Sequence, residues 1–347
     1  MPESTARHLP LHGETTTPGG AILRQGVLSL PAVRLHHGGR LERAAIAWRL
    51  AGPCGAPVVA ALGGISAHRI VHDADAPETG WWRELVGPGA PLDTKRYGVL
   101  GIDYLGGSGG SSAPTPGQSD FPVIDARDQA AAVLAVCDAI GIPKLHAIVG
   151  ASYGGMVGLA FAEIAPARVG GVLAIGAAHR SNALATGWRS IQRAIVRHGL
   201  ANGDGSGGLS LARALAMTTY RTRAELERRF PVVACLKNGR PTFDVERYLL
   251  SRGDDYAGHY RPETFLCLSE SIDLHRIDPA RIRVPVTLAA IADDQLVPVD
   301  DVRELAGTLG GRATLFELNS EYGHDAFLKE RALFAPVFSQ ALDGVDP

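Results

Sequence analysis

Residues 145–156 read LHAIVGASYGGM and contain the most informative fold signal in the chain. It predicts a short buried strand, a sharp turn and a helix, because an apolar run is followed by G-x-S-x-G and by an apolar segment that Pro166 ends. Gly150 and Gly154 let the strand and the helix approach closely and let Ser152 adopt a strained backbone conformation. The turn is expected to expose the Ser152 hydroxyl at the carboxyl edge of a sheet, where backbone N–H groups of a helix N-terminus can bind a developing oxyanion.

Other short apolar runs, bounded by glycine and proline, predict the remaining strands of this sheet. They lie at 44–50, 57–62, 97–104, 169–175, 284–292 and 313–318. Residues 125–140 have the amphipathic pattern of a helix that Gly141 ends, and 80–86 are expected to form a helical turn near the surface. Strands that alternate with helices predict an α/β fold with a mostly parallel sheet and helices on both faces.

The pattern changes between residues 178 and 283, where strand-like runs disappear, helical stretches follow one another and arginine becomes frequent. We interpret 178–283 as a helical cap inserted into a core made of 21–177 and 284–347. Open parallel sheets bind ligands at the carboxyl ends of their strands, so the cap is expected to form one wall of the active site. Residues 1–20 are polar and are expected to be poorly ordered.

Composition excludes several classes of partner. The 34 Lys and Arg residues nearly balance the 36 Asp and Glu residues, so no overall field favours nucleic acid or an anionic membrane. The four cysteines are far apart and form no C-x-x-C pair, which argues against a zinc site or a disulfide framework. The first twenty residues lack the apolar core of a signal peptide, and no run of about eighteen apolar residues occurs. We expect a cytoplasmic protein with no bound metal and no permanently bound cofactor.

A serine hydroxyl needs a base and an orienting carboxylate before it can act as a nucleophile. In this architecture the chain order is Ser, Asp, His. His324 is the best-placed histidine, because it directly follows the last predicted strand. Asp293 and Asp294 both follow the strand predicted at 284–292, and either could serve; Asp294 is our first choice.

An oxyanion hole for Ser152 requires two N–H donors. The residue after the nucleophile, Tyr153, supplies one of them in this fold. The second comes from the loop after the strand at 57–62, so Leu62 or Gly63 is expected to donate it.

Four motifs together give the chain a family resemblance from about Leu62 onward. They are G-x-S-x-G-G-M at 150–156, A-R-x-x-A-M-x-T-Y at 212–220, D-x-L-x-P at 294–298 and G-H-D-A-F-L at 323–328. With these motifs the chain resembles the homoserine O-acyltransferases of the methionine pathway, a branch of the α/β-hydrolase fold. The resemblance implies Ser152, Asp294 and His324 as the catalytic triad and Leu62 with Tyr153 as the oxyanion donors. It also implies a homodimer.

The same resemblance implies the substrates: an acyl-CoA donor and L-homoserine, bound by Arg213, Tyr220 and Asp325. This assignment agrees with the chemistry, because a guanidinium matches the carboxylate of an amino acid and a carboxylate matches its ammonium group. The expected reaction is a ping-pong transfer through an acyl-serine.

The acyl donor stays open between succinyl-CoA and acetyl-CoA. This sequence departs from the family pattern at 60–64, at Tyr153 and at 110–114, near the acyl pocket, which inclines us toward succinyl-CoA. Arg69 and Arg180 are candidate cations for the distal carboxylate of a succinyl group. The alternatives are transfer to serine, an esterase, and a hydrolase-like binding module without catalysis.

Overall fold

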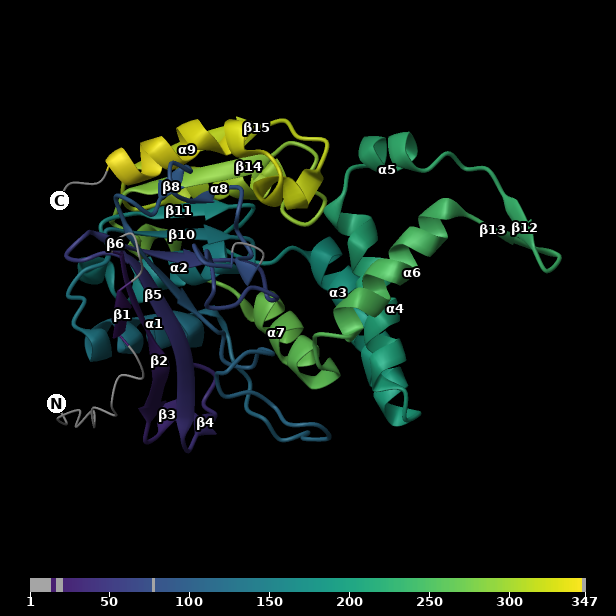
Figure 1. Cartoon of the computed structure of the whole chain (residues 1–347), viewed down its shortest axis with the longest axis horizontal. Helices are drawn as coiled ribbons and strands as arrows, with labels where there is room; N and C mark the ends of the chain where they lie inside the picture. Colours follow the sequence, from purple (N-terminus) through teal and green to yellow (C-terminus); the bar gives the residue numbers. More distant parts are fainter. Residues whose placement is uncertain (1–13, 17–20, 77–78, 345–347) are drawn as a thin grey trace.

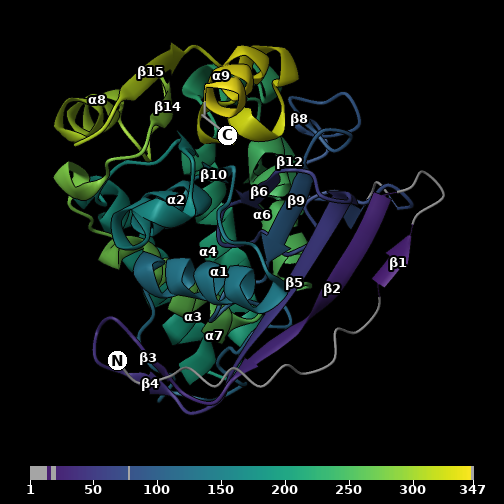
Figure 2. The ribbon, with the colours of Figure 1, turned by 90° about the vertical axis from the view of Figure 1, so that its left-hand side faces the viewer.

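A nine-stranded sheet forms the centre of the protein in the computed structural model, which describes residues 14–16, 21–76 and 79–344. The strands run in the order β1-β2-β5-β9-β6-β10-β11-β14-β15 (Figures 1 and 2). Their bounds are β1 Glu14–Thr16, β2 Ala21–Leu30, β5 Ala44–Pro53, β6 Val58–Leu62, β9 Gly98–Ile102, β10 Ala147–Ala151, β11 Val172–Ile175, β14 Val286–Ile291 and β15 Ala313–Leu318. From β9 to β15 neighbouring strands pair in parallel, whereas β1, β2 and β5 add an antiparallel edge. The predicted mostly parallel α/β sheet is therefore confirmed.

Helices cover both faces of the sheet. The helices outside the 178–283 segment are α1 Ala126–Ile140, α2 Tyr153–Ile164, α8 Val299–Thr308 and α9 Arg331–Asp343. Side chains of α1, α2 and α8 share one apolar core with one face of the sheet, and side chains of α9 share a second core with the other face. Strands β9, β10, β11 and β14 are buried throughout, as expected where helices cover both faces of a parallel sheet.

The segment 80–86 differs from its prediction as a helical turn near the surface. It forms turns that lead into β7 (Val86–Gly87), which pairs with β8 (Leu92–Asp93), and Trp82 and Leu85 are fully buried. The indole N–H of Trp82 donates to the carbonyl of Phe327 at 2.9 Å. This segment covers the same face of the sheet as α9, so its apolar side chains belong to the core.

Five α-helices lie between β11 and β14 and stand to one side of the sheet in Figure 1. They are α3 Ala183–Ala201, α4 Gly205–Tyr220, α5 Arg223–Arg229, α6 Asp244–Ala257 and α7 Pro262–Leu274. A separate small core holds several of them together; its buried members are Val196, Leu209, Ala212, Tyr256 and Phe265.

A hairpin interrupts these helices, contrary to the expectation that strand-like runs disappear there. Strand β12 (Cys235–Lys237) pairs with β13 (Arg240–Thr242), and with α5 the hairpin extends far from the sheet (Figure 1). Asn238 and Gly239 connect the strands with φ values of 53° and 73°, as an Asn-Gly hairpin turn requires. The strands are three residues long and mostly exposed, so they leave no apolar pattern in the sequence.

Short elements complete the chain: the ribbon of β3 (Val33–Arg34) and β4 (Arg40–Leu41) and 3₁₀ helices at Pro166–Arg168, Pro279–Arg281 and Gly323–Leu328. The N-terminus predicted to be poorly ordered, 1–20, lies outside the described residues apart from 14–16. Within the part of the chain that the structure describes, no helix combines the length and apolar character needed to cross a bilayer.

Candidate active site

Ser152 lies on a strained turn between β10 and α2. Its φ of 55° and ψ of −122° place it in a region that residues with a side chain rarely adopt. A Cβ at Gly154 would overlap the carbonyl of Leu62, and a Cβ at Gly150 would overlap the carbonyl of Gly154. The two glycines are therefore required by close backbone approach, and the strain holds the serine at the carboxyl end of β10.

Three side chains from separate strand ends meet at this turn. Nδ1 of His324 lies 2.6 Å from Oδ2 of Asp294, and Nε2 lies 2.8 Å from Oγ of Ser152. An ionised carboxylate only accepts hydrogen bonds, so Nδ1 carries the proton and donates to Asp294. In neutral His324, Nε2 is then free to accept the proton of the Ser152 hydroxyl. This is the geometry of a nucleophile with its general base.

The backbone of the β14–α8 loop fixes the carboxylate of Asp294. Its Oδ1 accepts hydrogen bonds from the N–H groups of Leu296 at 2.8 Å and Val297 at 3.1 Å, which leaves Oδ2 for His324. Asp293, the second candidate, is exposed. The structure thus brings Asp294 and not Asp293 to the histidine.

The pKa of His324 reflects two opposing influences. Burial alone would lower it, but the charge of Asp294 and the hydrogen bond to that carboxylate outweigh the burial and raise the pKa above its usual value of 6.5. A general base is most effective when its pKa lies near the working pH, so this shift suits His324 to proton transfer near neutrality.

The expected oxyanion donors lie next to Ser152. Tyr153 is the first residue of α2, and the N–H groups in the first turn of a helix have no intrahelical acceptor. The end of β6 lies directly against the turn, since Leu62 is in register with Gly150. The hydroxyl of Tyr104 donates to the carbonyl of Gly63 at 2.7 Å and so holds the peptide that follows Gly63.

A cavity of about 320 Å³ opens beside Ser152 and His324. The three residues predicted to bind an amino acid, Arg213, Tyr220 and Asp325, all line it. Nη1 of Arg213 lies 3.3 Å from the Tyr220 hydroxyl, and its guanidinium lies over the ring of Tyr256, 4.6 Å from the centroid. Among the described residues no carboxylate lies within ion-pair distance of Arg213. Its charge is therefore available to an anionic ligand.

Asp325 has a partner that the sequence did not reveal. Nε of Arg221 lies 3.2 Å from Oδ2 of Asp325, at an angle that makes an ion pair without a hydrogen bond. Burial raises the pKa of Asp325, against the opposing charges of Arg221 and His324. A cationic ligand beside Asp325 would stabilise its ionised form.

The two arginines predicted to bind a succinyl carboxylate have different surroundings. Arg69 does not line the cavity, because its guanidinium is bound to the buried carboxylate of Asp103. Arg180 lines the cavity but is paired with Glu304 at 2.7 Å. A third cation, Arg189, also lines the cavity and was not singled out from the sequence, where only the frequency of arginine in the cap pointed to it.

One group among the described residues has the spacing of a metal site. It consists of His36, His37 and Asp125, whose ligand atoms lie within 4.8 Å of one another. Asp125 already caps α1 by accepting from the N–H groups of Arg127 and Asp128, and none of the three metal-site candidates lines the cavity beside Ser152. The group therefore has a structural explanation.

The sheet order, the nucleophile turn and the Ser-His-Asp contacts together define an α/β-hydrolase-fold protein. The family model described as "alpha/beta hydrolase fold" matches residues 71–330. A homoserine O-succinyltransferase of Xanthomonas campestris pv. campestris is 42% identical over 93% of this chain and 84% of its own. A serine O-succinyltransferase of Litchfieldella anticariensis is 32% identical over 91% of this chain and 97% of its own.

Among solved structures, a homoserine O-acetyltransferase from Bacillus anthracis superposes with a TM-score of 0.85 at 19% identity, over 92% of this chain and 98% of that one. The chain belongs to the homoserine O-acyltransferase family of the α/β-hydrolase fold.

Proposed function

We propose that this protein is a homoserine O-acyltransferase of methionine biosynthesis that prefers succinyl-CoA and acts in the cytoplasm. The observation that supports homoserine as the acceptor is the presence of one positive and one negative side chain beside the nucleophile. Arg213 offers a cation that no carboxylate of the described residues pairs with, and Asp325 offers an anion, both in the cavity that Ser152 lines. An α-amino acid has both complementary charges, and its side-chain hydroxyl would reach the acyl-serine.

The chemistry follows from the contacts of His324. Its Nε2 takes the proton of Ser152 while Oγ attacks the thioester carbonyl, and the N–H groups of Tyr153 and of Leu62 or Gly63 stabilise the oxyanion. The C–S bond then breaks, and CoA leaves as the thiol with the proton from His324. In the second half the homoserine hydroxyl gives its proton to His324 and attacks the acyl-serine, and Oγ leaves and regains the proton.

A second cavity supports CoA as the carrier of the acyl group. It measures about 1000 Å³ and shares Trp81, Arg213, Asp325 and Leu328 with the first. Cationic residues outnumber acidic ones in its lining: Arg83, Arg213, Arg221, Arg229, Arg252 and Lys329 against Glu84, Asp255 and Asp325. Such a surface attracts the anionic phosphates of CoA.

An exposed apolar arm supports the homodimer implied by the family. Val232, Val233 and Leu236 precede or lie in the β12–β13 hairpin and are 82%, 72% and 75% exposed. Three neighbouring apolar side chains with that exposure are typical of an interaction site. We infer that a second copy of this chain covers the arm.

The test of the function is a comparison of acceptors and donors with the purified protein. Succinyl-CoA with homoserine is expected to give O-succinylhomoserine, with parallel lines in double-reciprocal plots. Serine as the better acceptor would replace the assignment with serine O-acylation, and acetyl-CoA as the better donor would replace the succinyl preference. Release of free acid at a rate that homoserine does not change would instead identify an esterase.

A further inference from the structure

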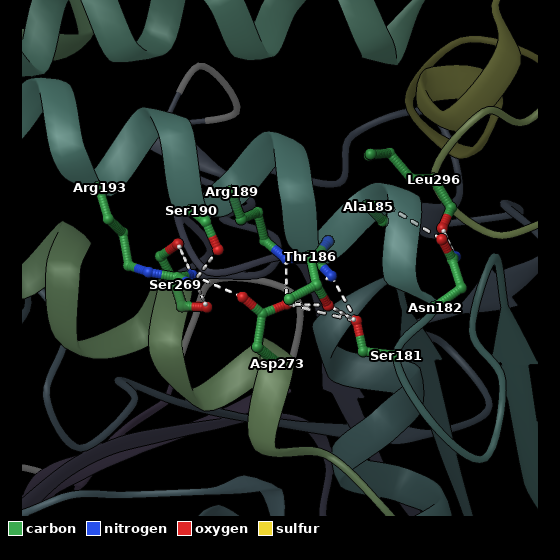
Figure 3. Close-up of polar contacts among 10 residues, drawn as sticks. All are labelled: Ser181, Asn182, Ala185, Thr186, Arg189, Ser190, Arg193, Ser269, Asp273 and Leu296. Carbon is green, nitrogen blue, oxygen red and sulfur yellow. Dashed lines mark hydrogen bonds and ion pairs between the residues drawn. The ribbon is translucent and has the colours of Figure 1, made fainter.

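A largely buried ionic cluster (Figure 3) lies between α3 and α7, and part of it lines the cavity. Asp273 of α7 faces two arginines of α3: Nε of Arg189 lies 2.7 Å from its Oδ1, and Nη1 of Arg193 lies 2.6 Å from its Oδ2. The remaining hydrogen-bond partners of Asp273 in Figure 3 are the neutral hydroxyl groups of Ser181 and Thr186, which donate to its Oδ1.

The charges in this cluster do not balance. Two guanidinium groups share one carboxylate, and among the described residues no second carboxylate lies within 4 Å of Arg189 or Arg193. Their side chains are only 11% and 10% exposed. A buried charge without compensation is unfavourable, so an anion that reached this wall would be stabilised.

Arg189 is the member of the pair that faces the cavity. It lines the same space as Ser152 and His324, whereas Arg193 does not. Its Nε and Nη2 are engaged with Asp273 and Ser181, and Nη1 has no hydrogen-bond partner among the described residues.

Gln192, three residues along α3, adds an unpartnered amide to this wall. It is 4% exposed and lines the cavity, and its side chain forms no hydrogen bond within the part of the chain that is described. Residues three apart lie on the same face of a helix. The amide of Gln192 is not among the fully buried unpartnered atoms of the described residues, so it is open to the cavity and available to a ligand there.

The other cations near the nucleophile are less suitable for an acyl carboxylate. Arg180 already has its own carboxylate, Glu304, and Arg69 does not line the cavity. Arg213 is assigned to the other substrate, because it is proposed to bind the carboxylate of the acceptor amino acid. Apart from Arg213, Arg189 is thus the cavity cation whose charge the described residues leave incompletely neutralised, because it shares its one carboxylate with Arg193.

We infer that Arg189, with Gln192, binds the distal carboxylate of an acyl group that ends in a carboxylate, such as succinyl, while that group is attached to CoA or to Ser152. The inference rests on the proposed function and names the residues that select the donor. A neutral acyl chain would give Nη1 of Arg189 and the amide of Gln192 no hydrogen-bond partner, so both groups favour an acyl chain that ends in a carboxylate.

The test compares succinyl-CoA with butyryl-CoA, whose four-carbon acyl chain lacks the carboxylate. In Arg189→Met, kcat/KM for succinyl-CoA is expected to fall roughly tenfold to hundredfold, the loss of one charge-assisted contact, while kcat/KM for butyryl-CoA does not fall. Gln192→Leu should lower the succinyl rate by less, and Arg189→Lys should retain part of it. Arg180→Met is the matched control, because it removes another cation of the same cavity.

Different results would refute the proposed succinyl donor and the proposed role of Arg189. A wild-type enzyme that does not prefer succinyl-CoA over butyryl-CoA would refute the proposed donor. If the wild-type enzyme prefers succinyl-CoA, the role of Arg189 is overturned by either of two results. One is that the preference survives in Arg189→Met, and the other is that it is lost in Arg180→Met instead. Should Arg189→Met fail to fold, the ratio of kcat/KM for succinyl-CoA to kcat/KM for butyryl-CoA is measured in Arg189→Lys and Gln192→Leu. A ratio unchanged from the wild type in both variants excludes this wall as the carboxylate site. The rate of Ser152 acylation by p-nitrophenyl acetate reports in every variant whether the triad is intact.

Discussion

Nε2 of His324 lies 2.8 Å from Oγ of Ser152, although 172 positions separate the two residues in the chain. The contact exists because β10 and β15 end at the same edge of the parallel sheet, with Ser152 directly after the first and His324 a few residues after the second. The proposed transfer passes a proton across this contact twice, when Oγ of Ser152 attacks the thioester and when it leaves the acyl group.

Replacement of Ser152 by alanine is expected to abolish the acyl-enzyme and to lower kcat by up to roughly a millionfold, as in other serine-triad enzymes. Intact-mass spectrometry after mixing with succinyl-CoA should show the added succinyl group in the wild type alone. An acylated Ser152→Ala protein would place the nucleophile elsewhere.

Replacement of Asp294 by asparagine should change the pH profile as well as the rate. The carboxylate raises the pKa of His324, so the acid limb of kcat/KM is expected above the usual value of 6.5 in the wild type. Without the charge, burial dominates, and the limb should move to lower pH while kcat falls on the order of 10⁴-fold. An unshifted limb would show that another group titrates.

Replacement of Arg213 by alanine should separate the two halves of the reaction. The first half, acylation of Ser152, should continue, while transfer to homoserine should weaken roughly tenfold to hundredfold through loss of one charge-assisted contact. Lysine should restore only part of the transfer, because a point charge cannot reproduce the bidentate fork. The measurement compares the rate of the acylation burst with the steady-state rate of transfer to homoserine. An equal loss of both rates would indicate that Arg213 has a structural role.

Replacement of Gly154 by alanine should destabilise the protein, because the new Cβ would overlap the carbonyl of Leu62. Overpacking of this kind costs about 1–3 kcal/mol, and more where backbone cannot move. Gly187→Ala in α3 is the matched control: its Cβ meets nothing within 4 Å, so it should stabilise the protein by about 0.5–1 kcal/mol. Urea denaturation measures both, and equal midpoints would contradict the requirement for glycine at the turn.

Replacement of Leu236 by aspartate should convert the proposed dimer to monomer, since a charge would enter the interface on the hairpin. Light scattering at several protein concentrations gives the mass, with Val123→Asp, an exposed apolar position outside the hairpin, as the control. A wild-type monomer at all concentrations, or a Leu236→Asp dimer, would show that the arm has another role.

Local sequence patterns predicted the sheet strands from β5 to β15, the nucleophile turn and the neighbourhood of the triad, but not the edge strands β1 and β2. These features depend on local patterns: apolar runs of strand length, glycines beside Ser152, and polar residues directly after strands. Parallel strands end at one edge, so residues that follow them are brought together whatever the details of packing. The motifs also predicted the family to which the chain belongs.

The tertiary structure alone decided which of several equivalent side chains face the cavity. Asp293 and Asp294 are adjacent and identical in chemistry, and only the loop N–H groups of Leu296 and Val297 orient Asp294 toward His324. By sequence Arg69 is as suitable as any arginine, but in the fold Asp103 binds its guanidinium, whereas Arg189 faces the cavity through the packing of α3 on α7. Side-chain direction depends on partners distant in the chain, and no local pattern encodes those partners.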